Sequence, residues 1–309
     1  MTDSLLTSAN NISQDDDSRP FEQLGLIGCG LMGGSFALAA KKAGLVKRVV
    51  GYSKSPSTTA RARQLGVIDI EAPSALLAAA GADIVLLAVP VAATEATLKA
   101  IKHLVTPQML IMDVGSTKTD VVHAAQRALR DRAGCFVPAH PITGREVSGV
   151  EHADAELYSG RQVILTPTER TQAAHLRRAQ ALWTAMGCRV NMMTPEAHDG
   201  AFATVSHLPH LLAFAALNAI TAQPQADAFL TLAGPGFRDF TRIAAADPKM
   251  WRDILRANSA EVLAQSRLFQ QALQALEQAM LAESSHPLEQ LIAQASQTRA
   301  NWRMGAERK

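Results

Sequence analysis

The stretch "LGLIGCGLMGGSFA", residues 24–37, decides the fold of the first half of the chain. Its glycines follow an apolar run and stand at the start of a helical pattern, where the first N–H groups suit an anion. Gly28 permits a tight turn, Gly30 lets the backbone approach a pyrophosphate, and Gly33 lets helix and strand pack closely. Cys29 is either a thiol near the phosphates or a small buried filler. We predict a dinucleotide-binding loop whose cofactor contacts are Gly28, Gly30, Leu31, Met32 and Gly33.

Short apolar runs alternate with helical patterns beyond this loop. Several runs are apolar throughout, as strands covered on both faces are. The alternation predicts an α/β fold with a Rossmann-like, doubly wound, mostly parallel sheet. The expected strands are 23–27, 48–52, 84–88, 109–113, 136–138, 162–166 and 189–192, and the expected helices are 32–43, 58–65, 74–80, 92–103 and 119–132.

The pattern becomes almost wholly helical near residue 194. Thr194 suits a helix N-cap and Pro195 the first helical position of an apolar helix over 196–221. Long apolar helices often complete their core against a second subunit, so we expect a homodimer; the alternative is a monomer whose helices pack on the sheet. We predict a disordered tail over 1–20, a dinucleotide-binding domain over 21–193, and an all-helical substrate and dimerisation domain over 194–309.

The composition is that of an ordinary soluble protein, with 309 residues, 48% of them hydrophobic, and a formal net charge of +2. The lack of a basic cluster argues against a nucleic-acid partner. Three scattered cysteines indicate a reducing compartment. The polar, acidic start is not a signal peptide, and the most apolar window, 75–94, is broken by Gly81, Asp83 and Pro90. We therefore expect a cytoplasmic protein without membrane contact.

The end of the second expected strand bears on the identity of the dinucleotide. An NAD-preferring site usually carries an acid about 20 residues after the glycine loop, where it binds the ribose hydroxyls. Ser53 and Lys54 occupy this place, and no acid occurs over 49–60. A serine and a lysine suit a 2′-phosphate, which a carboxylate would repel, and Arg61 and Arg63 offer further charge. We favour NADP as the cofactor and keep NAD as the alternative.

His140 is the first candidate for acid–base chemistry. It follows an expected strand, in a turn predicted from Pro141 and Gly144. Loops at the carboxyl ends of strands form the ligand crevice of an open α/β sheet, where a histidine can act as a general base near neutral pH. Ser116, in a neighbouring strand-end loop, can hydrogen-bond to the imidazole or to the nicotinamide amide. The alternative interpretation of His140 is a solvated loop side chain.

Three histidines, His198, His207 and His210, share the expected apolar helix. The spacing places His207 and His210 on one face, and Pro209 should kink the helix between them. Two histidines without a third ligand at a suitable spacing make a poor zinc site, and hydride transfer needs no metal. We therefore predict no metal.

Two arginines, Arg238 and Arg242, belong to a glycine-rich turn that opens a helix. A fork-shaped guanidinium suits a substrate carboxylate. The alternative is a surface ion pair with Asp239 or Asp247.

Five segments, in this order, resemble one known family: "GLIGCGLMGGS" (25–35), "DVGSTK" (113–118), "HPITGRE" (140–146), "SHLPHLLAFAA" (206–216) and "GFRDFTRIAAADPKMWRDI" (236–254). Together they resemble the prephenate/arogenate dehydrogenases of tyrosine biosynthesis, from residue 24 to about residue 277. The last segment is the specific one, because the glycine loop alone indicates only a dehydrogenase.

The resemblance implies oxidative decarboxylation of a cyclohexadienyl substrate. It implies that His140 accepts the proton of the ring 4-hydroxyl as hydride leaves the same carbon for the nicotinamide, and that loss of carbon dioxide makes the ring aromatic. Ser116 matches the family serine that positions this histidine and the cofactor, and Arg242 matches the arginine that binds a substrate carboxylate. The other residues that the resemblance places at the substrate are His210, His198 and Glu146.

Alternatives to this function remain. Prephenate carries a pyruvyl side chain and arogenate an amino acid; we favour prephenate and keep arogenate, or both, open. Asp199 is a candidate partner for the arogenate ammonium group, although a helix N-terminal acid favoured by the dipole explains it equally well. A β-hydroxyacid or imine reductase would need a catalytic lysine or its equivalent on the helical domain. A non-catalytic NADP sensor would lack the set His140, Ser116 and Arg242.

Overall fold

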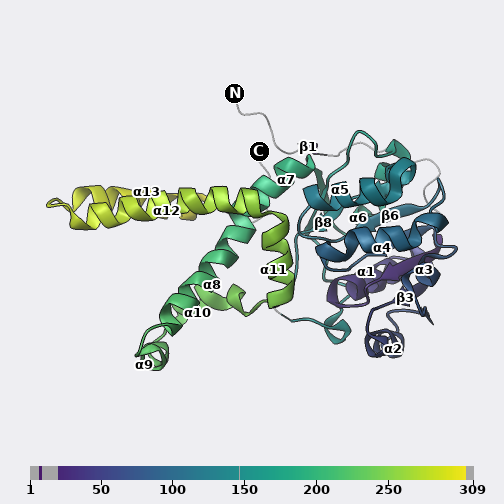
Figure 1. Ribbon diagram of the computed structural model, residues 1–309, viewed down its shortest axis with the longest axis horizontal. Coiled ribbons are helices and arrows are strands. Elements are labelled where there is room, and N and C mark those ends of the chain that lie inside the picture. Colours follow the sequence, from purple (N-terminus) through teal and green to yellow (C-terminus); the bar gives the residue numbers. More distant parts are fainter. Residues whose placement is uncertain (1–6, 9–19, 146, 304–309) are drawn as a thin grey trace. The chain divides into compact units, whose positions relative to one another are not determined.

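The computed structural model describes residues 7–8, 20–145 and 147–303. Six strands form a parallel sheet in the order β4-β3-β2-β5-β6-β7 (Figure 1). This is the order of a doubly wound nucleotide-binding sheet, which leaves a ligand crevice between β2 and β5, where the strand order reverses. The strands are β2 (Phe21–Ile27), β3 (Val46–Tyr52), β4 (Ile70–Glu71), β5 (Ile84–Leu87), β6 (Leu110–Asp113) and β7 (Phe136–Val137).

Helices cover both faces of this sheet, because successive strand residues point to opposite faces and both sets are apolar. Leu24 and Leu26 of β2 belong to a core with Phe36 and Trp183, whereas Val85 of β5 belongs to the core of the other face. α4 and α5 lie side by side (Figure 1). The helices are α1 (Leu31–Lys42), α2 (Pro56–Gln64), α3 (Ala75–Ala79), α4 (Thr94–Ile101), α5 (Thr119–Leu129) and α6 (Ala173–Ala185).

The last two expected strands belong to a second sheet, with the order β1-β10-β9-β8. β9 (Gln162–Leu165) and β10 (Arg189–Met192) are parallel, and β8 (Ala139–Pro141) runs antiparallel to β9. His140, opposite Ile164, therefore lies in a strand and not in the predicted turn. β8 is an edge strand, where a proline is tolerated, so Pro141 did not signal a turn.

The segment predicted to be a disordered tail contains β1 (Thr7–Ser8), which pairs antiparallel with β10. For these two residues the prediction is wrong, because an open strand edge offers backbone partners to any extended segment. Residues 1–6 and 9–19 lie outside the described part of the chain.

The expected apolar helix forms as one run of three pieces: α7 (Pro195–Phe202), a π-helical turn (Ala203–His207) and α8 (Leu208–Thr221). The Thr194 side chain accepts a hydrogen bond from the Ala197 N–H, as predicted for an N-cap. Pro209 has no N–H to donate into the preceding turn, which explains the wider turn before it. Length and composition alone would allow the run Pro195–Thr221 to cross a membrane, and 17% of its most apolar window is buried.

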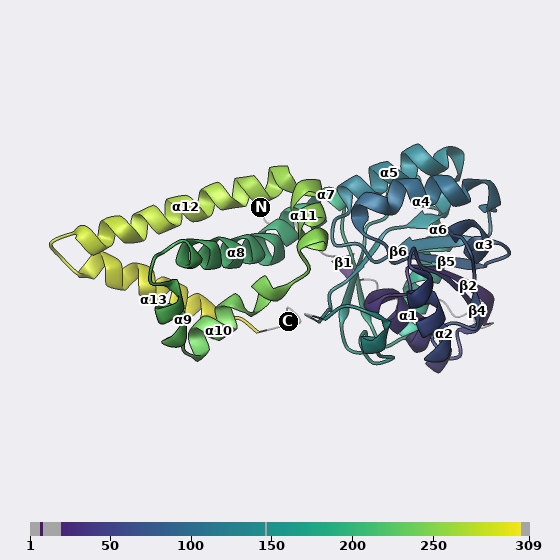
Figure 2. The same cartoon turned by 60° about the horizontal axis from the view of Figure 1, so that its bottom comes forward.

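The remaining helices are α9 (Ala226–Thr231), α10 (Pro235–Thr241), a 3₁₀ turn η6 (Arg242–Ala245), α11 (Pro248–Ala257), α12 (Ser259–Leu281) and α13 (His286–Asn301). Two compact units divide the chain at a different place from the predicted border near residue 193. The first, Met1–Asn258, contains both sheets together with α7–α11, and the second, Ser259–Lys309, contains α12 and α13. Figure 2 shows α12 and α13 side by side as a hairpin.

Candidate active site

The glycine loop joins β2 to α1 at the crevice of the parallel sheet. Gly28 has a φ of +102° and donates its N–H to the Tyr52 carbonyl at 2.8 Å. A Cβ on Gly28 would lie 2.2 Å from the Ala88 carbonyl oxygen, and one on Gly33 would lie 2.0 Å from the Gly28 oxygen. A Cβ on Gly30 would meet no described atom within 4 Å. The first and third glycines are therefore required by packing, whereas Gly30 keeps the loop open towards a ligand.

The start of α1 fits the pyrophosphate of a dinucleotide. Gly30 is the N-cap, no side chain caps the helix, and no acid stands in its first turn. Its first N–H groups can therefore bind an anion, and the helix dipole favours this. Leu31 is buried, and the Met32 carbonyl accepts a hydrogen bond from the Tyr158 hydroxyl at 2.7 Å, which fixes this first turn.

Ser53 contacts the glycine loop directly. Its Oγ accepts the N–H of Cys29 at 2.8 Å, and its own N–H donates to Thr59 Oγ1 at 3.1 Å. Cys29 is fully buried, and burial raises the pKa of its thiol to about 11, against a smaller lowering by Ser53. Cys29 is thus a buried filler and not a reactive thiol.

The three cations expected near the adenosine ribose of the dinucleotide differ in their contacts. Lys54 is exposed directly after β3. Arg61 lies 3.8 Å from Glu151, and Arg63 donates to the Asp69 carbonyl. Among the described residues, Lys54 is the one of these three cations that makes no hydrogen bond or ion pair, and it follows Ser53 directly.

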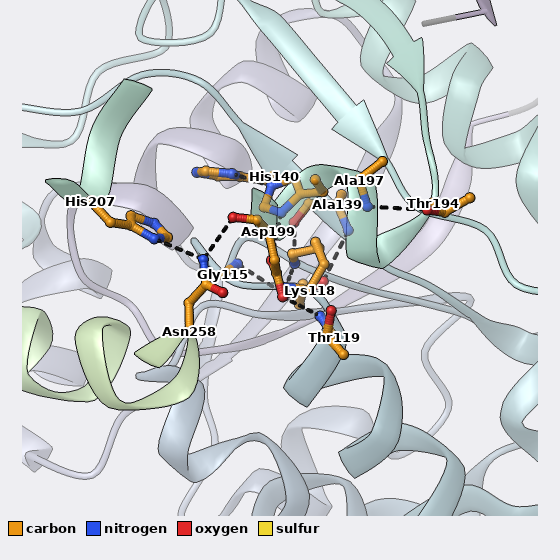
Figure 3. Close-up of polar contacts among 12 residues, drawn as sticks. Gly115, Lys118, Thr119, Ala139, His140, Thr194, Ala197, Asp199, His207 and Asn258 are labelled. Atoms are coloured by element: carbon orange, nitrogen blue, oxygen red, sulfur yellow. Dashed lines mark hydrogen bonds and ion pairs between the residues drawn. The ribbon is translucent and has the colours of Figure 1, made fainter. Parts of the chain in front are cut away.

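A buried ion pair joins the end of β6 to β8 (Figure 3). Lys118 Nζ lies 2.5 Å from Asp113 Oδ2, and the two side chains are 0% and 3% exposed. Lys118 Nζ also donates to the Ala139 carbonyl at 2.8 Å, and the Ala139 N–H donates to Asp113 Oδ1 at 3.0 Å. Both backbone groups of Ala139 are thus held, which fixes the residue before His140 at the carboxyl end of β6.

His140 is a partly accessible residue with one histidine partner. Its Nδ1 lies 2.8 Å from Nε2 of His198. Burial, and then the neighbouring His198, Lys118 and His207, hold the pKa of His140 well below its usual value. The ring is therefore neutral near pH 7 and can accept a proton.

His198 and Asp199 continue this chain of contacts. His198 Nδ1 lies 2.8 Å from Asp199 Oδ1, and the His198 side chain has no exposed surface. Asp199 also accepts the N–H groups of Lys118 at 2.8 Å and Thr119 at 2.9 Å, at the start of α5. Burial alone would raise the pKa of Asp199, but these hydrogen bonds outweigh it and lower the pKa.

Two sequence-based predictions concern this part of the network. Asp199 is buried and both its oxygens accept hydrogen bonds, which argues against its predicted contact with a substrate ammonium group. His198 is fully buried and contacts His140 and Asp199 through its two ring nitrogens, and its contact with substrate stays a prediction. The sequence placed these residues on one helix and could not show that their partners lie near 118 and 140.

Asn258, at the end of α11, links this network to a third histidine. Its Nδ2 donates to the Asp199 carbonyl at 2.8 Å and lies 3.1 Å from Nδ1 of His207. Burial lowers the pKa of His207 to about 4. Its Nε2 has no hydrogen-bond partner among the described residues, although the Ser116 backbone lies near enough to raise the pKa slightly.

His207 and His210 do lie on one side of their helix, and both face Trp251 of α11. The ring centroids of His210 and Trp251 are 3.6 Å apart in a stacked arrangement, and those of His207 and Trp251 are 6.0 Å apart. His210 Nδ1 contacts the Ser206 carbonyl at 2.9 Å. Within residues 7–8, 20–145 and 147–303, no three His, Cys, Asp or Glu side chains are grouped to hold a metal.

The other predicted site residues lie as follows. Ser116 is partly accessible in the loop between β6 and α5, and no hydrogen bond joins it to His140 in the described structure. Arg242 is exposed at the start of η6, which packs against α8. Arg238 pairs with Asp239 at 3.2 Å on the surface, as the alternative interpretation had it. Glu146 lies outside the described residues.

Sequence reasoning missed several residues of the network, among them Lys118, Phe202 and Asn258. Lys118 stands in the quoted segment 113–118, where a lysine five residues after a strand-end acid was a usable signal. Phe202 stacks on His198 at 4.4 Å and lies 4.8 Å from His140, between ring centroids. Nothing in the sequence marks Phe202 or Asn258, since each is defined only by its tertiary neighbours.

Comparison with known proteins matches this chain to one family. The family model for the nucleotide-binding domain of prephenate dehydrogenase matches residues 36–192, and the model for its dimerization domain matches residues 194–294. A prephenate dehydrogenase of Bacillus subtilis is 38% identical over 77% of this chain, which spans 64% of that relative's length. A cyclohexadienyl dehydrogenase of Zymomonas mobilis is 34% identical over 79% of this chain and 83% of its own length.

Solved structures agree with these matches. The prephenate dehydrogenase of Aquifex aeolicus, in complex with hydroxyphenyl propionate and NAD+, is 35% identical with a TM-score of 0.86, covering 92% of this chain and 99% of its own. The arogenate dehydrogenase of Synechocystis is 26% identical with a TM-score of 0.76, covering 90% and 99%.

Proposed function

Because this chain belongs to the prephenate dehydrogenase family of NAD(P)-dependent oxidoreductases, we propose that it converts prephenate to 4-hydroxyphenylpyruvate and carbon dioxide. The observation that carries the proposal is His140, a neutral and partly accessible histidine beside the carboxyl end of β6. The open glycine loop lies at the carboxyl end of β2 in the same sheet. A base and a dinucleotide site at one edge of the sheet suit oxidation of an alcohol.

His140 performs the proton transfer in this proposal. The 4-hydroxyl O–H bond of prephenate breaks, and its proton moves to the free nitrogen of His140. At the same time the hydrogen on the carbon that bears this hydroxyl group leaves as hydride, with the electron pair of its bond. The bound cofactor supplies the hydride acceptor. Cleavage of the bond to the ring carboxylate releases carbon dioxide, and the proton returns to the oxygen of the new phenol. The aromatic product makes the reaction effectively irreversible.

The remaining roles follow the family resemblance. Arg242 holds a substrate carboxylate, and Ser116 contacts the substrate or the cofactor beside His140. His210 presents Nε2 to the pocket, since its Nδ1 is engaged by the Ser206 carbonyl. In this proposal a cation and two hydrogen-bonding groups orient the reacting carbon.

We propose NADP as the preferred cofactor. Ser53 lies against the glycine loop and Lys54 is exposed beside it, while the segment 49–60 carries no acid. The relative from Aquifex aeolicus holds NAD+ in its crystal structure, which supports a nicotinamide cofactor without separating the two dinucleotides.

Arogenate is the second candidate substrate, because the Zymomonas mobilis relative is a cyclohexadienyl dehydrogenase. The structure weakens the residue-level case for it. Asp199, the proposed ammonium partner, is buried and engaged by backbone N–H groups. Prephenate therefore stays the first choice.

We also propose a cytoplasmic homodimer. Large apolar side chains are exposed in both compact units, and the dimerization model covers these segments. So many large apolar side chains left exposed favour a protein contact that covers them. Light scattering should give twice the chain mass of 33.0 kDa, and a monomer at micromolar concentration would contradict the proposal. The exposed apolar residues are Val205, Phe229, Leu232, Phe240, Leu263, Leu268, Leu273, Met280 and Leu281.

The test of function crosses prephenate and arogenate with NAD+ and NADP+ and follows the absorbance of reduced nicotinamide. We expect the fastest reduction with prephenate and NADP+. A faster reaction with arogenate would reverse the choice of substrate, and no reduction in any of the four mixtures would refute the proposed activity.

A further inference from the structure

We propose that His198 and Asp199 form a positioning relay behind His140, which fixes the tautomer of the base so that Nε2, and not Nδ1, receives the substrate proton. The inference deepens the proposed function and rests on it. His198 then acts through His140. This role replaces the substrate contact that the family resemblance implies.

The protonation pattern follows from the order of the contacts. Asp199 is held ionised by two backbone N–H donors, so its Oδ1 only accepts, and His198 Nδ1 must carry a proton. Burial lowers the pKa of His198, against a smaller rise caused by Asp199, so the ring is neutral and its Nε2 is an acceptor. His140 Nδ1, 2.8 Å away, must then donate. In a neutral His140 this leaves the lone pair on Nε2.

Further contacts hold each residue of the relay in place. The Asp199 carboxylate is fixed by the Lys118 and Thr119 N–H groups, and Asn258 holds the Asp199 carbonyl. Phe202 lies against both imidazoles. Rotation of either ring to exchange its nitrogens would therefore break at least one of the hydrogen bonds that join His140, His198 and Asp199.

The same chain stabilises the cation that forms on His140. When Nε2 takes a proton, the Nδ1–H bond to His198 strengthens, because Asp199 polarises the His198 ring. The charged and titratable groups that act on the two rings are Lys118, Asp113, Asp199 and His207. Lys118 opposes protonation of His140, as His207 does when it is itself protonated. Asp199, which is hydrogen-bonded to His198, is the carboxylate of the relay that offsets them.

The first experiment reads the tautomer without turnover. In protein labelled with ¹⁵N-histidine, long-range proton–nitrogen correlation at neutral pH distinguishes Nδ1–H from Nε2–H, and loss of the signals in His140→Asn assigns the ring. We expect His140 to carry its proton on Nδ1. A proton on Nε2 overturns the relay, whatever the substrate of the enzyme proves to be.

The second experiment separates positioning from substrate contact. His198→Phe keeps the stacked ring but removes the acceptor; His198→Gln offers an amide oxygen near the place of Nε2. We expect His198→Phe to lower kcat by about 10²-fold to 10⁴-fold with KM changed less than about threefold, and His198→Gln to recover at least about tenfold. His140 in the Phe variant should lose its fixed Nδ1–H signal.

A matched control is His123→Phe, since His123 is an exposed histidine of α5 outside the network. Its kcat should stay within about twofold of the parent value. A His198→Phe variant that is folded and turns over as fast as the parent overturns the relay. A rise in KM with unchanged kcat also overturns it, because His198 would then contact substrate. If the parent oxidises neither cyclohexadienyl substrate, the proposed function fails while the tautomer experiment still decides the relay.

Discussion

The glycine loop and the His140 network, the two halves of the proposed site, are built differently. The loop depends on backbone conformation: Gly28 needs a positive φ, and Gly33 needs the absence of a side chain. The network depends on side chains from distant parts of the chain, since His140 and His198 are 58 residues apart and Lys118 and Asp199 are 81 apart. Cofactor binding is thus specified locally, whereas the base is specified by tertiary contacts.

This difference predicts that the two halves can be damaged separately. Changes in the network should reduce turnover or stability and spare cofactor affinity, while changes beside the loop should alter cofactor choice and spare the base. The following variants test that separation.

The largest effect is expected for His140→Asn. Loss of the general base should lower turnover by about 10²-fold to 10⁴-fold, with the Kd for NADP+ nearly unchanged. Steady-state kinetics and equilibrium titration of the cofactor measure the two quantities on one protein. Turnover close to that of the parent would remove His140 from its role, and a large loss of cofactor affinity would break the proposed separation.

Lys118→Met should be next in size, because it leaves the buried Asp113 carboxylate without its cation. The free energy of unfolding should fall by about 3–5 kcal/mol. Lys99→Met is the matched control: Lys99 pairs with Glu95 at 2.7 Å but is 56% exposed, so its loss should cost less than about 1 kcal/mol. Urea unfolding of both variants checks this, and equal losses would contradict the account of the buried pair.

Acid should destabilise the network through His207, whose pKa of about 4 lies below the ordinary value of 6.5. The unfolded chain takes up this proton first as pH falls, so the stabilisation is complete above pH 6.5 and is lost between 6.5 and 4. Between about pH 7 and pH 5 the loss from this group is about 2 kcal/mol. Unfolding of His207→Asn should show a smaller acid loss than the parent; identical losses would refute the assignment to His207.

The smallest effect concerns the loop. Ser53→Asp should shift the ratio of kcat/KM values towards NAD+ by about tenfold, because a carboxylate repels the 2′-phosphate. Ser57→Asp, with the same added charge in the exposed first turn of α2, should shift the ratio much less. An unchanged ratio in Ser53→Asp would show that the NADP argument is wrong.

Local sequence rules predicted the sheet and its glycine loop well. The strand over 189–192 and the N-cap at Thr194 form as predicted, since each depends on a few neighbouring residues. The strand at 139–141 was missed, because its backbone partners in β9 are more than 20 residues away and Pro141 resembles a turn signal. The helix α6 was likewise not predicted, since its apolar pattern is weak.

The candidate site was predicted in part. The sequence marked His140 by its position after a strand, and the structure confirms that position. The residue itself lies in the strand β8 and not in the expected turn. The positions of His198 and Asp199 in the sequence say nothing about which residues they meet, so their contacts with His140, Lys118 and Thr119 could not be predicted. Cys29 shows the same limit, because only the packing around it distinguishes a reactive thiol from a buried one.

The most direct test of the central claim is the stoichiometry of the reaction with prephenate and NADP+. Carbon dioxide and NADPH should be measured in the same reaction mixture under single-turnover conditions. The account predicts one carbon dioxide released for each NADPH formed. NADPH formed without carbon dioxide, or carbon dioxide released at the same rate without the dinucleotide, would contradict it.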